Sequence, residues 1–396
     1  MTEFETTVPD EDGDRFDLDQ ADSAGLVLSQ RELVLEIRSS FALVQPHDVE
    51  VAAWFYQHFL TANPRYRKYF SNDPAVIQRR LFLAVERIVA DLDRLDVFLP
   101  YLRRLALRHR KFGLRPAHYQ AFGTSLLATL RHFAGDRWTE RSEAAWETGY
   151  GLVASVMLAA VDEADQQTPA FWEAEVTGHE VLSAGIAQLT LRLRQDRDRP
   201  GPYVFRAGQY AAIETPGLVR TWRDFSFSGT PKADGEVEFQ IQAGRPGGIS
   251  DLLVNATAVG DRVRIAAAEG ELAFPGPARA LRLVAVAHGT GAAPIFALIQ
   301  AMAATGDLRP LTVLLVTEGQ PHYLAGPFER LAAEHGSLTV EHLIGDPAAA
   351  VRAHALAVEG TRGAVLVGPS PLVESCRTAL VRGGVEPGDI SSDLFG

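Results

Sequence analysis

Apolar side chains recur along the chain first with the spacing of a helix and then, after residue 167, with the alternation of a strand. Between residues 26 and 167, positions that share one helical face recur every three to four residues. Pro74 and Pro116 stand where helices can begin, because a proline in the first turn loses no helical hydrogen bond. This pattern predicts about six to eight helices and no strand. Two of the predicted faces are Val49, Ala53, Tyr56, Leu60 and Gln78, Phe82, Val85, Val89.

The pattern changes at residue 168. Short stretches of alternating residues, separated by Gly, Pro and Asp, predict a small antiparallel β-barrel over residues 168–276. After Pro277, near-continuous apolar runs alternate with helical patterns, which predicts an α/β domain with a parallel sheet over residues 277–396. The predicted strands are 186–193, 210–213, 237–241, 262–265, 281–287 and 311–316.

Composition agrees with several folded domains. The chain has 396 residues, 46% of them hydrophobic and 22% charged, which exceeds the size of one ordinary domain. Residues 1–25 are rich in Asp and Glu and poor in apolar residues, which predicts a disordered acidic tail. The only cysteine, Cys376, excludes an internal disulfide and is expected to be a buried residue.

The net charge of the chain and its lack of long apolar segments limit the classes of partner and the cellular locations to expect. A formal net charge of -12, without a run of Lys and Arg, argues against nucleic acid as a partner. The N-terminus has no basic segment leading into an apolar run, and no uninterrupted apolar stretch approaches the length of a membrane span. We therefore expect a cytoplasmic protein with no membrane span.

A histidine lies on the inner face of one predicted helix. Leu102, Leu105 and His109 share a face in the segment LRRLALRHRKFGLRPAHYQAFG. A single histidine on an apolar face is either a hydrogen-bonded core residue or a metal ligand. The string from His109 to Tyr119 resembles the proximal segment of the flavohaemoglobins, in which a haem-binding globin is fused to a reductase that uses FAD and a nicotinamide. The resemblance implies that His109 ligates the iron of haem b and that Tyr119, a candidate catalytic residue, supports its imidazole.

The segment WFYQHFLTANPRYRKYF is similar to the family's first distal helix and the corner after it. The resemblance implies that Tyr56 is the distal tyrosine, Phe70 the phenylalanine that packs on the haem, and Gln78 the distal glutamine. A tyrosine hydroxyl in a dry pocket can donate a hydrogen bond to bound dioxygen and slow its release. Ordinary aromatic packing is the alternative for Tyr56 and Phe70.

Two positions depart from the family pattern on the proximal side. Arg108 precedes the histidine where the best-known members have lysine. The family's proximal glutamate has no clear counterpart, and Asp162 and Glu163 are the nearest acids.

Several short motifs in the predicted barrel resemble the flavin site of ferredoxin-reductase-like proteins. The stretch Arg223-Asp-Phe225-Ser226 is similar to the signature Arg-x-Tyr-Ser. Its arginine can neutralise a pyrophosphate, its phenylalanine can cover the isoalloxazine ring, and its serine can hydrogen-bond a polar edge of the ring. The other residues that the resemblance assigns to FAD are Gln209, Tyr210, Gly247, Gly248, Ile249 and Ser250.

The last third contains a strand, a glycine-rich turn and a helical pattern in that order, as dinucleotide binding requires. Gly289, Gly291 and Pro294 form the turn and helix start, and Gly368 with Pro369 resembles the family's loop at the nicotinamide. His288 stands where the family has glycine, and Val367 stands where it has cysteine.

The chain ends in Asp-Leu-Phe-Gly, and the resemblance implies that Phe395 lies against the flavin with Asp393 near the nicotinamide. Glu318 can accept a ribose hydroxyl and repel a phosphate, which favours NADH over NADPH.

The resemblance implies a nitric oxide dioxygenase with dioxygen and nitric oxide as substrates, in which NAD(P)H electrons pass through FAD to haem. Two alternatives remain at this point: oxidation of another donor such as lactate at the flavin, and a haem-based gas sensor.

Overall fold

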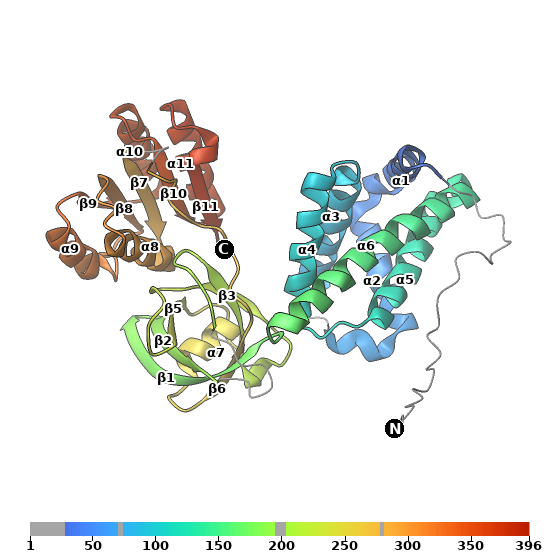
Figure 1. Ribbon diagram of the computed structural model, residues 1–396, viewed down its shortest axis with the longest axis horizontal. Helices are drawn as coiled ribbons and strands as arrows, with labels where there is room; N and C mark the ends of the chain where they lie inside the picture. Colours follow the sequence, from blue (N-terminus) through green and yellow to red (C-terminus); the bar gives the residue numbers. More distant parts are fainter. Residues whose placement is uncertain (1–27, 70–73, 195–202, 278–280, 396) are drawn as a thin grey trace, which may run out of the picture. The chain divides into compact units, whose positions relative to one another are not determined.

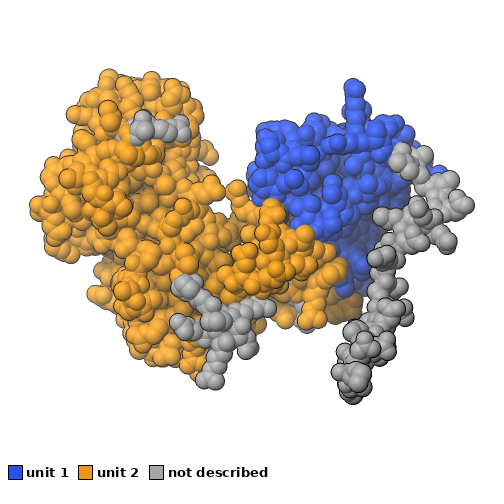
Figure 2. Space-filling view, viewed as in Figure 1, with its two compact units in different colours: residues 1–64, 75–102, 117–156 blue, residues 65–74, 103–116, 157–396 orange. Residues whose placement is uncertain are grey.

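The computed structural model describes residues 28–69, 74–194, 203–277 and 281–395, so the expected acidic tail and Phe70 lie outside it. The contacts between residues divide the chain into two compact units (Figure 2). Unit 1 consists of Met1–Pro64, Ala75–Leu102 and Ala117–Val156, and unit 2 of Arg65–Pro74, Arg103–Pro116 and Met157–Gly396.

The first described part of the chain is entirely helical, as the sequence predicts. Six α-helices and three short 3-10 helices precede residue 168, with no strand among the residues that the structure describes there. The α-helices are α1 (Gln30–Val44), α2 (Asp48–Ala62), α3 (Pro74–Asp91), α4 (Leu95–Arg110), α5 (Pro116–Ala134) and α6 (Glu140–Gln167). The predicted starts at Pro74 and Pro116 are confirmed. Ser29 begins α1 with a capping box, in which its side chain and that of Glu32 satisfy each other's backbone amides.

The predicted inner face of α2 is only partly right, because Leu60 is buried but Val49 and Ala53 are exposed, whereas that of α3 is confirmed at Phe82 and Val89. Val49 is 71% exposed, and the buried side of α2 consists of Val51, Ala52, Phe55, Phe59 and Leu60. Apolar residues occupy several sides of this helix, so periodicity alone does not select the face that packs. On α3, Phe82 and Val89 are buried as expected.

Helix α6 is long and apolar enough, by length and composition alone, to cross a membrane. The expectation concerned uninterrupted apolar stretches, and the apolar run of α6 is interrupted by Glu143, Glu147 and Asp162. The core helix of a globular protein meets the same criterion, and α6 buries Trp146, Val153, Met157 and Ala160. We therefore treat α6 as a core helix.

The predicted barrel is an antiparallel sheet of six strands in the order β4-β3-β6-β1-β2-β5 (Figure 1). A bridge between Phe227 and Phe239 joins the chain after β4 to β5 and closes the sheet. Helix α7 (Ile249–Asn255) buries Ile249, Leu253 and Val254 in the core of this barrel. The strands are β1 (Trp172–Ser183), β2 (Ile186–Leu193), β3 (Tyr210–Glu214), β4 (Arg223–Ser226), β5 (Glu236–Gln242) and β6 (Arg262–Ile265).

The last third is a parallel sheet of five strands in the order β11-β10-β7-β8-β9. Helices α8 and α9 pack in one apolar core and α10 and α11 in another, so both faces of the sheet are covered. The elements are β7 (Leu283–His288), α8 (Ala292–Ala304), β8 (Leu311–Thr317), α9 (Ala325–Glu334), β9 (Leu338–Ile344), α10 (Asp346–Val358), β10 (Gly363–Gly368), α11 (Ser370–Arg382) and β11 (Ile390–Leu394). The predicted fold class, helices followed by an antiparallel barrel and a parallel α/β sheet, is confirmed.

Candidate functional site

His109 lies in the last turn of α4 with its ring orientation fixed. Its Nδ1 atom is 2.7 Å from the carbonyl oxygen of Leu105, one turn earlier. A carbonyl oxygen only accepts hydrogen bonds, so Nδ1 carries the proton and the lone pair of Nε2 is free. Burial lowers the pKa of His109, which keeps the imidazole neutral at neutral pH. This is the form of histidine that ligates a metal.

No group of three or more His, Cys, Asp or Glu side chains in the described part of the chain has the arrangement of a metal site. The protein alone therefore offers no metal cage among these residues. A single neutral histidine is the donor set that suits an iron whose other ligands come from a macrocycle.

Tyr119, at the start of α5, has a buried hydroxyl without a hydrogen-bond partner among the described residues. Its backbone carbonyl accepts a 2.7 Å hydrogen bond from the hydroxyl of Tyr150 on α6. Burial raises the pKa of Tyr119, so the phenol remains protonated and able to donate. A buried donor without an acceptor is costly, which makes the Tyr119 hydroxyl a candidate for a contact that a bound group completes.

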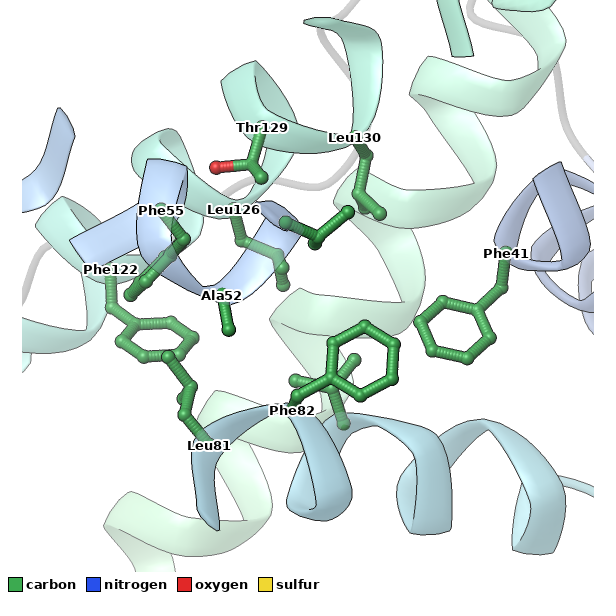
Figure 3. Close-up of a pocket in the computed structure, with 11 residues that line it drawn as sticks. Phe41, Ala52, Phe55, Leu81, Phe82, Phe122, Leu126, Thr129 and Leu130 are labelled. Atoms are coloured by element: carbon green, nitrogen blue, oxygen red, sulfur yellow. The ribbon is translucent and has the colours of Figure 1, made fainter. Parts of the chain in front are cut away.

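The expected distal residues Tyr56 and Gln78 lie on α2 and α3 of unit 1, and both are half-buried. A small apolar cavity of about 20 Å³ lies in the same unit, among α1, α2, α3 and α5 (Figure 3). Neither Tyr56 nor Gln78 lines it. The one polar side chain in its wall, Thr129, donates its hydroxyl proton to the carbonyl of Ser125. The lining is therefore apolar, and consists of Phe41, Val51, Ala52, Phe55, Leu81, Phe82, Val85, Phe122, Leu126, Thr129 and Leu130.

The acids considered for the proximal side do not lie in an enclosed pocket. Glu163 forms an ion pair with Arg103, and both side chains are more than half exposed. No sequence pattern indicates this pairing, because the two residues are 60 positions apart. The carboxylate of Glu163, one of the two acids nearest to the position of the family's proximal glutamate, is therefore paired with Arg103.

In the barrel, antiparallel pairing places the expected flavin residues side by side. Tyr210 on β3 is directly opposite Ser226 on β4, and Ala211 is opposite Phe225. The Gln209 side chain joins two loops, because its amide oxygen accepts from the Arg206 amide and its Nε2 donates to the Gly270 carbonyl. Gln209 therefore holds this edge of the barrel in shape.

The loop before α7 has free donors, although not at its glycines. The amides of Gly247 and Gly248 donate to Asp251 and to the Arg245 carbonyl. The next amides, at Ile249 and Ser250, open the helix and so lack intrahelical acceptors. The Ser250 hydroxyl is buried and has no partner among the described residues. An anion that accepts from Ser250 would satisfy this hydroxyl.

The three segments expected at the nicotinamide meet in unit 2. A Cβ atom added to Gly291 would lie 2.8 Å from the carbonyl oxygen of Val367 and 2.9 Å from the Phe395 ring. The Phe395 amide donates to the Gly368 carbonyl at 3.2 Å. The glycine turn, the end of β10 and the C-terminal strand therefore form one wall, and only glycine fits at position 291.

Two histidines near this wall were not part of the expected site. His322 is buried, and its Nε2 atom lies 2.9 Å from the Gly289 carbonyl, which ties the glycine turn to the loop after β8. His288, at the end of β7, lies 3.9 Å from the exposed carboxylate of Glu318. No sequence spacing indicated these contacts, since they join separate strand ends of the parallel sheet.

Comparisons with known proteins agree with this architecture. The globin family profile matches residues 53–157. A flavohemoprotein of Bacillus subtilis is 24% identical over 324 residues, covering 78% of this chain and 79% of its own length. A flavohemoprotein of Bordetella parapertussis is 24% identical over 393 residues, covering 91% of this chain and 96% of its own length.

Solved structures share the fold over all or part of the chain. A flavohemoglobin of Malassezia yamatoensis, crystallised with FAD and haem bound, aligns with a TM-score of 0.76 at 19% identity. That alignment covers 92% of this chain and 99% of the other. An Amycolatopsis cytochrome P450 reductase aligns with a TM-score of 0.50 at 23% identity over 57% of this chain and 69% of its own. Helices, an antiparallel barrel and a parallel sheet thus follow one another in a chain that is similar to flavohemoproteins over most of its length and shares the fold of a flavohemoglobin, with a globin profile matched by residues 53–157.

Proposed function

We propose that this protein is a cytoplasmic nitric oxide dioxygenase that uses NAD(P)H, FAD and haem b to convert nitric oxide and dioxygen to nitrate. The observation that carries the proposal is the order of modules in one chain, matched over 92% of its length by a flavohemoglobin with FAD and haem bound. The proposed modules are 26–167 for haem, 168–276 for FAD and 277–396 for the nicotinamide. When bound, these groups supply hydride acceptance at the flavin and one-electron and dioxygen chemistry at the iron.

We assign the iron ligand to His109. Support comes from its free Nε2 lone pair and from the burial that keeps the ring neutral. Tyr119 has a buried hydroxyl available to a partner on the proximal side. Tyr56 and Gln78 are assigned to the distal side, where their polar groups would donate to bound dioxygen, and Phe70 to packing on the haem.

We assign the FAD pyrophosphate to Arg223 and to the start of α7. Arg223 is exposed and makes no ion pair with any described residue. Ser250 contributes the unpartnered hydroxyl, and Ile249 contributes a free amide. Gly247 and Gly248 form the turn that brings these donors together. The remaining barrel residues assigned to the flavin are Gln209, which shapes the edge, and Tyr210, Phe225 and Ser226, which lie along the paired strands β3 and β4.

We assign the nicotinamide to the wall where Gly291, Gly368 and Phe395 meet. Gly289 and Pro294 shape the turn and the first part of α8, and Pro369 opens α11. Glu318, whose side chain is 90% exposed just after β8, favours NADH, because its carboxylate would repel a ribose phosphate.

One sample of purified protein tests the proposed function. Its absorption spectrum is expected to show haem and flavin bands together, and NADH is expected to drive nitric oxide consumption in air with nitrate formed in step. Reduction of the haem by lactate instead of NADH would indicate the alternative donor. Absence of reduction by either donor would contradict an enzymatic role and favour a gas sensor.

A further inference from the structure

A cluster of charged groups surrounds Arg108, the residue before His109. Its Nε atom lies 3.0 Å from a carboxylate oxygen of Glu269, in the loop after β6. Its Nη2 atom lies 3.1 Å from the Asp224 carboxylate on β4 and 3.1 Å from the Tyr210 hydroxyl on β3. One guanidinium therefore contacts three separate places on the barrel.

These contacts lie within unit 2, because residues 103–116 cluster with the barrel and not with the rest of the helices. The ion pair is partly shielded: the side chains of Arg108 and Glu269 are 41% and 21% exposed. A fork of guanidinium donors that binds two carboxylates and a phenol also fixes direction, which a lysine at this position would do less well. Lys111 adds a second cation, with its Nζ atom 5.8 Å from the centre of the Trp222 ring.

The position of this cluster links the two electron carriers of the proposed function. Arg108 directly precedes His109, which is assigned to the iron. Asp224 lies between Arg223 and Phe225, which are both assigned to the flavin. Electron transfer between two bound groups depends steeply on their separation and orientation. A contact that fixes the iron-bearing segment on the flavin-bearing strands therefore bears on that step.

The last two turns of α4 have independent anchors, so we expect the helix to stay in place when Arg108 is lost. Arg110 is buried, and its guanidinium bonds Asp165 and Thr168 at the end of α6. Arg103 pairs with Glu163 on the exposed side. Arg108 is the arginine of these turns that holds the barrel.

We propose that Arg108, through Glu269 and Asp224, is a positioning residue that holds segment 103–116 on the barrel and sets the rate of electron transfer from flavin to haem. This inference rests on the proposed function for the electron step. The holding contact itself is independent of any bound group.

The test compares Arg108→Glu, the exchange variant Arg108→Glu/Glu269→Arg, and the matched control Arg103→Glu, which reverses a charge on the same helix. Flavin-to-haem transfer is measured by stopped flow as haem reduction by NADH, and flavin function as NADH-driven reduction of a soluble dye. Hydrogen exchange of residues 103–116 reports the contact without relying on activity.

We expect Arg108→Glu to slow haem reduction about tenfold or more, with dye reduction within about twofold of the parent protein and faster hydrogen exchange in 103–116. The exchange variant is expected to recover part of both losses, since it restores opposite charges at positions 108 and 269 but leaves Asp224 without its cation. Arg103→Glu is expected to leave haem reduction and dye reduction as in the parent protein, because Arg103 pairs with Glu163 on α6 and not with the barrel.

Unchanged haem reduction in Arg108→Glu, or an equal loss of dye reduction, would overturn the proposal. Failure of the exchange variant to recover either readout would also overturn it. If the parent protein binds no haem, the proposed function fails, and hydrogen exchange in the same three variants still decides whether Arg108 holds the segment.

Discussion

At the scale of single residues, the chemistry depends on which polar atoms are left free. His109 has one ring nitrogen committed to Leu105 and the other free. Two more atoms, the hydroxyls of Tyr119 and Ser250, are buried without partners among the described residues. Such atoms are rare in folded proteins because each costs free energy, so we propose that bound groups complete the contacts of these two hydroxyls. Ser228 Oγ and the Nδ1 atoms of His58 and His288 are also buried without partners among the described residues.

His109→Ala is expected to abolish stable haem binding, because the variant loses the free Nε2 lone pair assigned to the iron. Haem content is measured from the Soret band and by pyridine haemochrome assay after gel filtration. His118→Ala, in the next helix, is the control and is expected to keep its haem. A normal Soret band with stoichiometric haem in His109→Ala would show that another residue ligates the iron.

Cys376 is expected to be unreactive in the folded protein. Its side chain is fully buried in the core beneath α10 and α11, as the sequence predicted, and burial raises the pKa of the thiol to about 11. Because the thiolate is the reactive form, almost none is present below pH 9. A thiol reagent is expected to label Cys376 only after denaturation. Rapid labelling of the native protein at pH 7.5 would contradict this burial.

At the scale of elements, two short connections contain several of the residues proposed to bind FAD and the nicotinamide: the loop into α7 and the turn into α8. Both follow strands, so the sheet fixes where each connection begins. The conformation of each loop then decides which hydrogen-bond donors are available to a ligand. At α7 these are the first helical amides and the Ser250 hydroxyl, because the amides of Gly247 and Gly248 already donate within the loop.

Arg223→Ala and Ser250→Ala are each expected to weaken FAD retention, and the arginine change more strongly. A charge-assisted hydrogen bond contributes roughly 1.5–3 kcal/mol and a neutral one about 1 kcal/mol. Flavin content is measured after dialysis, and haem content is expected to stay constant. Thr257→Ala, two residues beyond the end of α7, is the matched control. Full FAD occupancy in both variants would remove the phosphate assignment.

Gly291→Ala is expected to lower kcat/KM for NADH by about tenfold or more, since the added methyl group displaces the Val367 carbonyl or the Phe395 ring. FAD content is expected to be retained. Gly276→Ala is the control, because a Cβ atom there meets nothing within 4 Å. If Gly291→Ala reduced the dye with parental kinetics, Gly291 would not belong to the nicotinamide site.

At the scale of the whole molecule, the question is whether haem and flavin modules form one electron path. Contacts divide the chain differently from the modules expected from its sequence, because segments 103–116 and 157–167 cluster with residues 168–396 in unit 2. The helical module is therefore not a closed compact unit by itself.

Carbon monoxide is expected to inhibit NADH-dependent nitric oxide consumption in air while sparing NADH-dependent dye reduction in the same sample. The gas binds ferrous haem and has no target on a flavin. Both rates are measured on one preparation, with nitrate determined at the end. Nitric oxide removal that continues under carbon monoxide would place the reaction at the flavin and contradict the dioxygenase proposal.

Much of the architecture followed from local pattern. The change from helical period to alternation at residue 168, and from alternation to continuous apolar runs after residue 277, predicted the three kinds of structure in their order. Strands 186–193 and 262–265 coincide with β2 and β6. These predictions succeeded because burial on one face or on both faces leaves a direct imprint on the order of residues.

Only the tertiary structure decided which of several apolar faces packs and which distant charges meet. On α2, packing selected the face of Phe55 and Phe59 instead of the one containing Val49. Glu163 pairs with Arg103, and Arg108 contacts Asp224 and Glu269, although more than 100 residues separate Arg108 from either acid in the sequence. The sequence around a charged residue does not indicate which residue it will pair with, because an ion pair depends on which surfaces meet after folding.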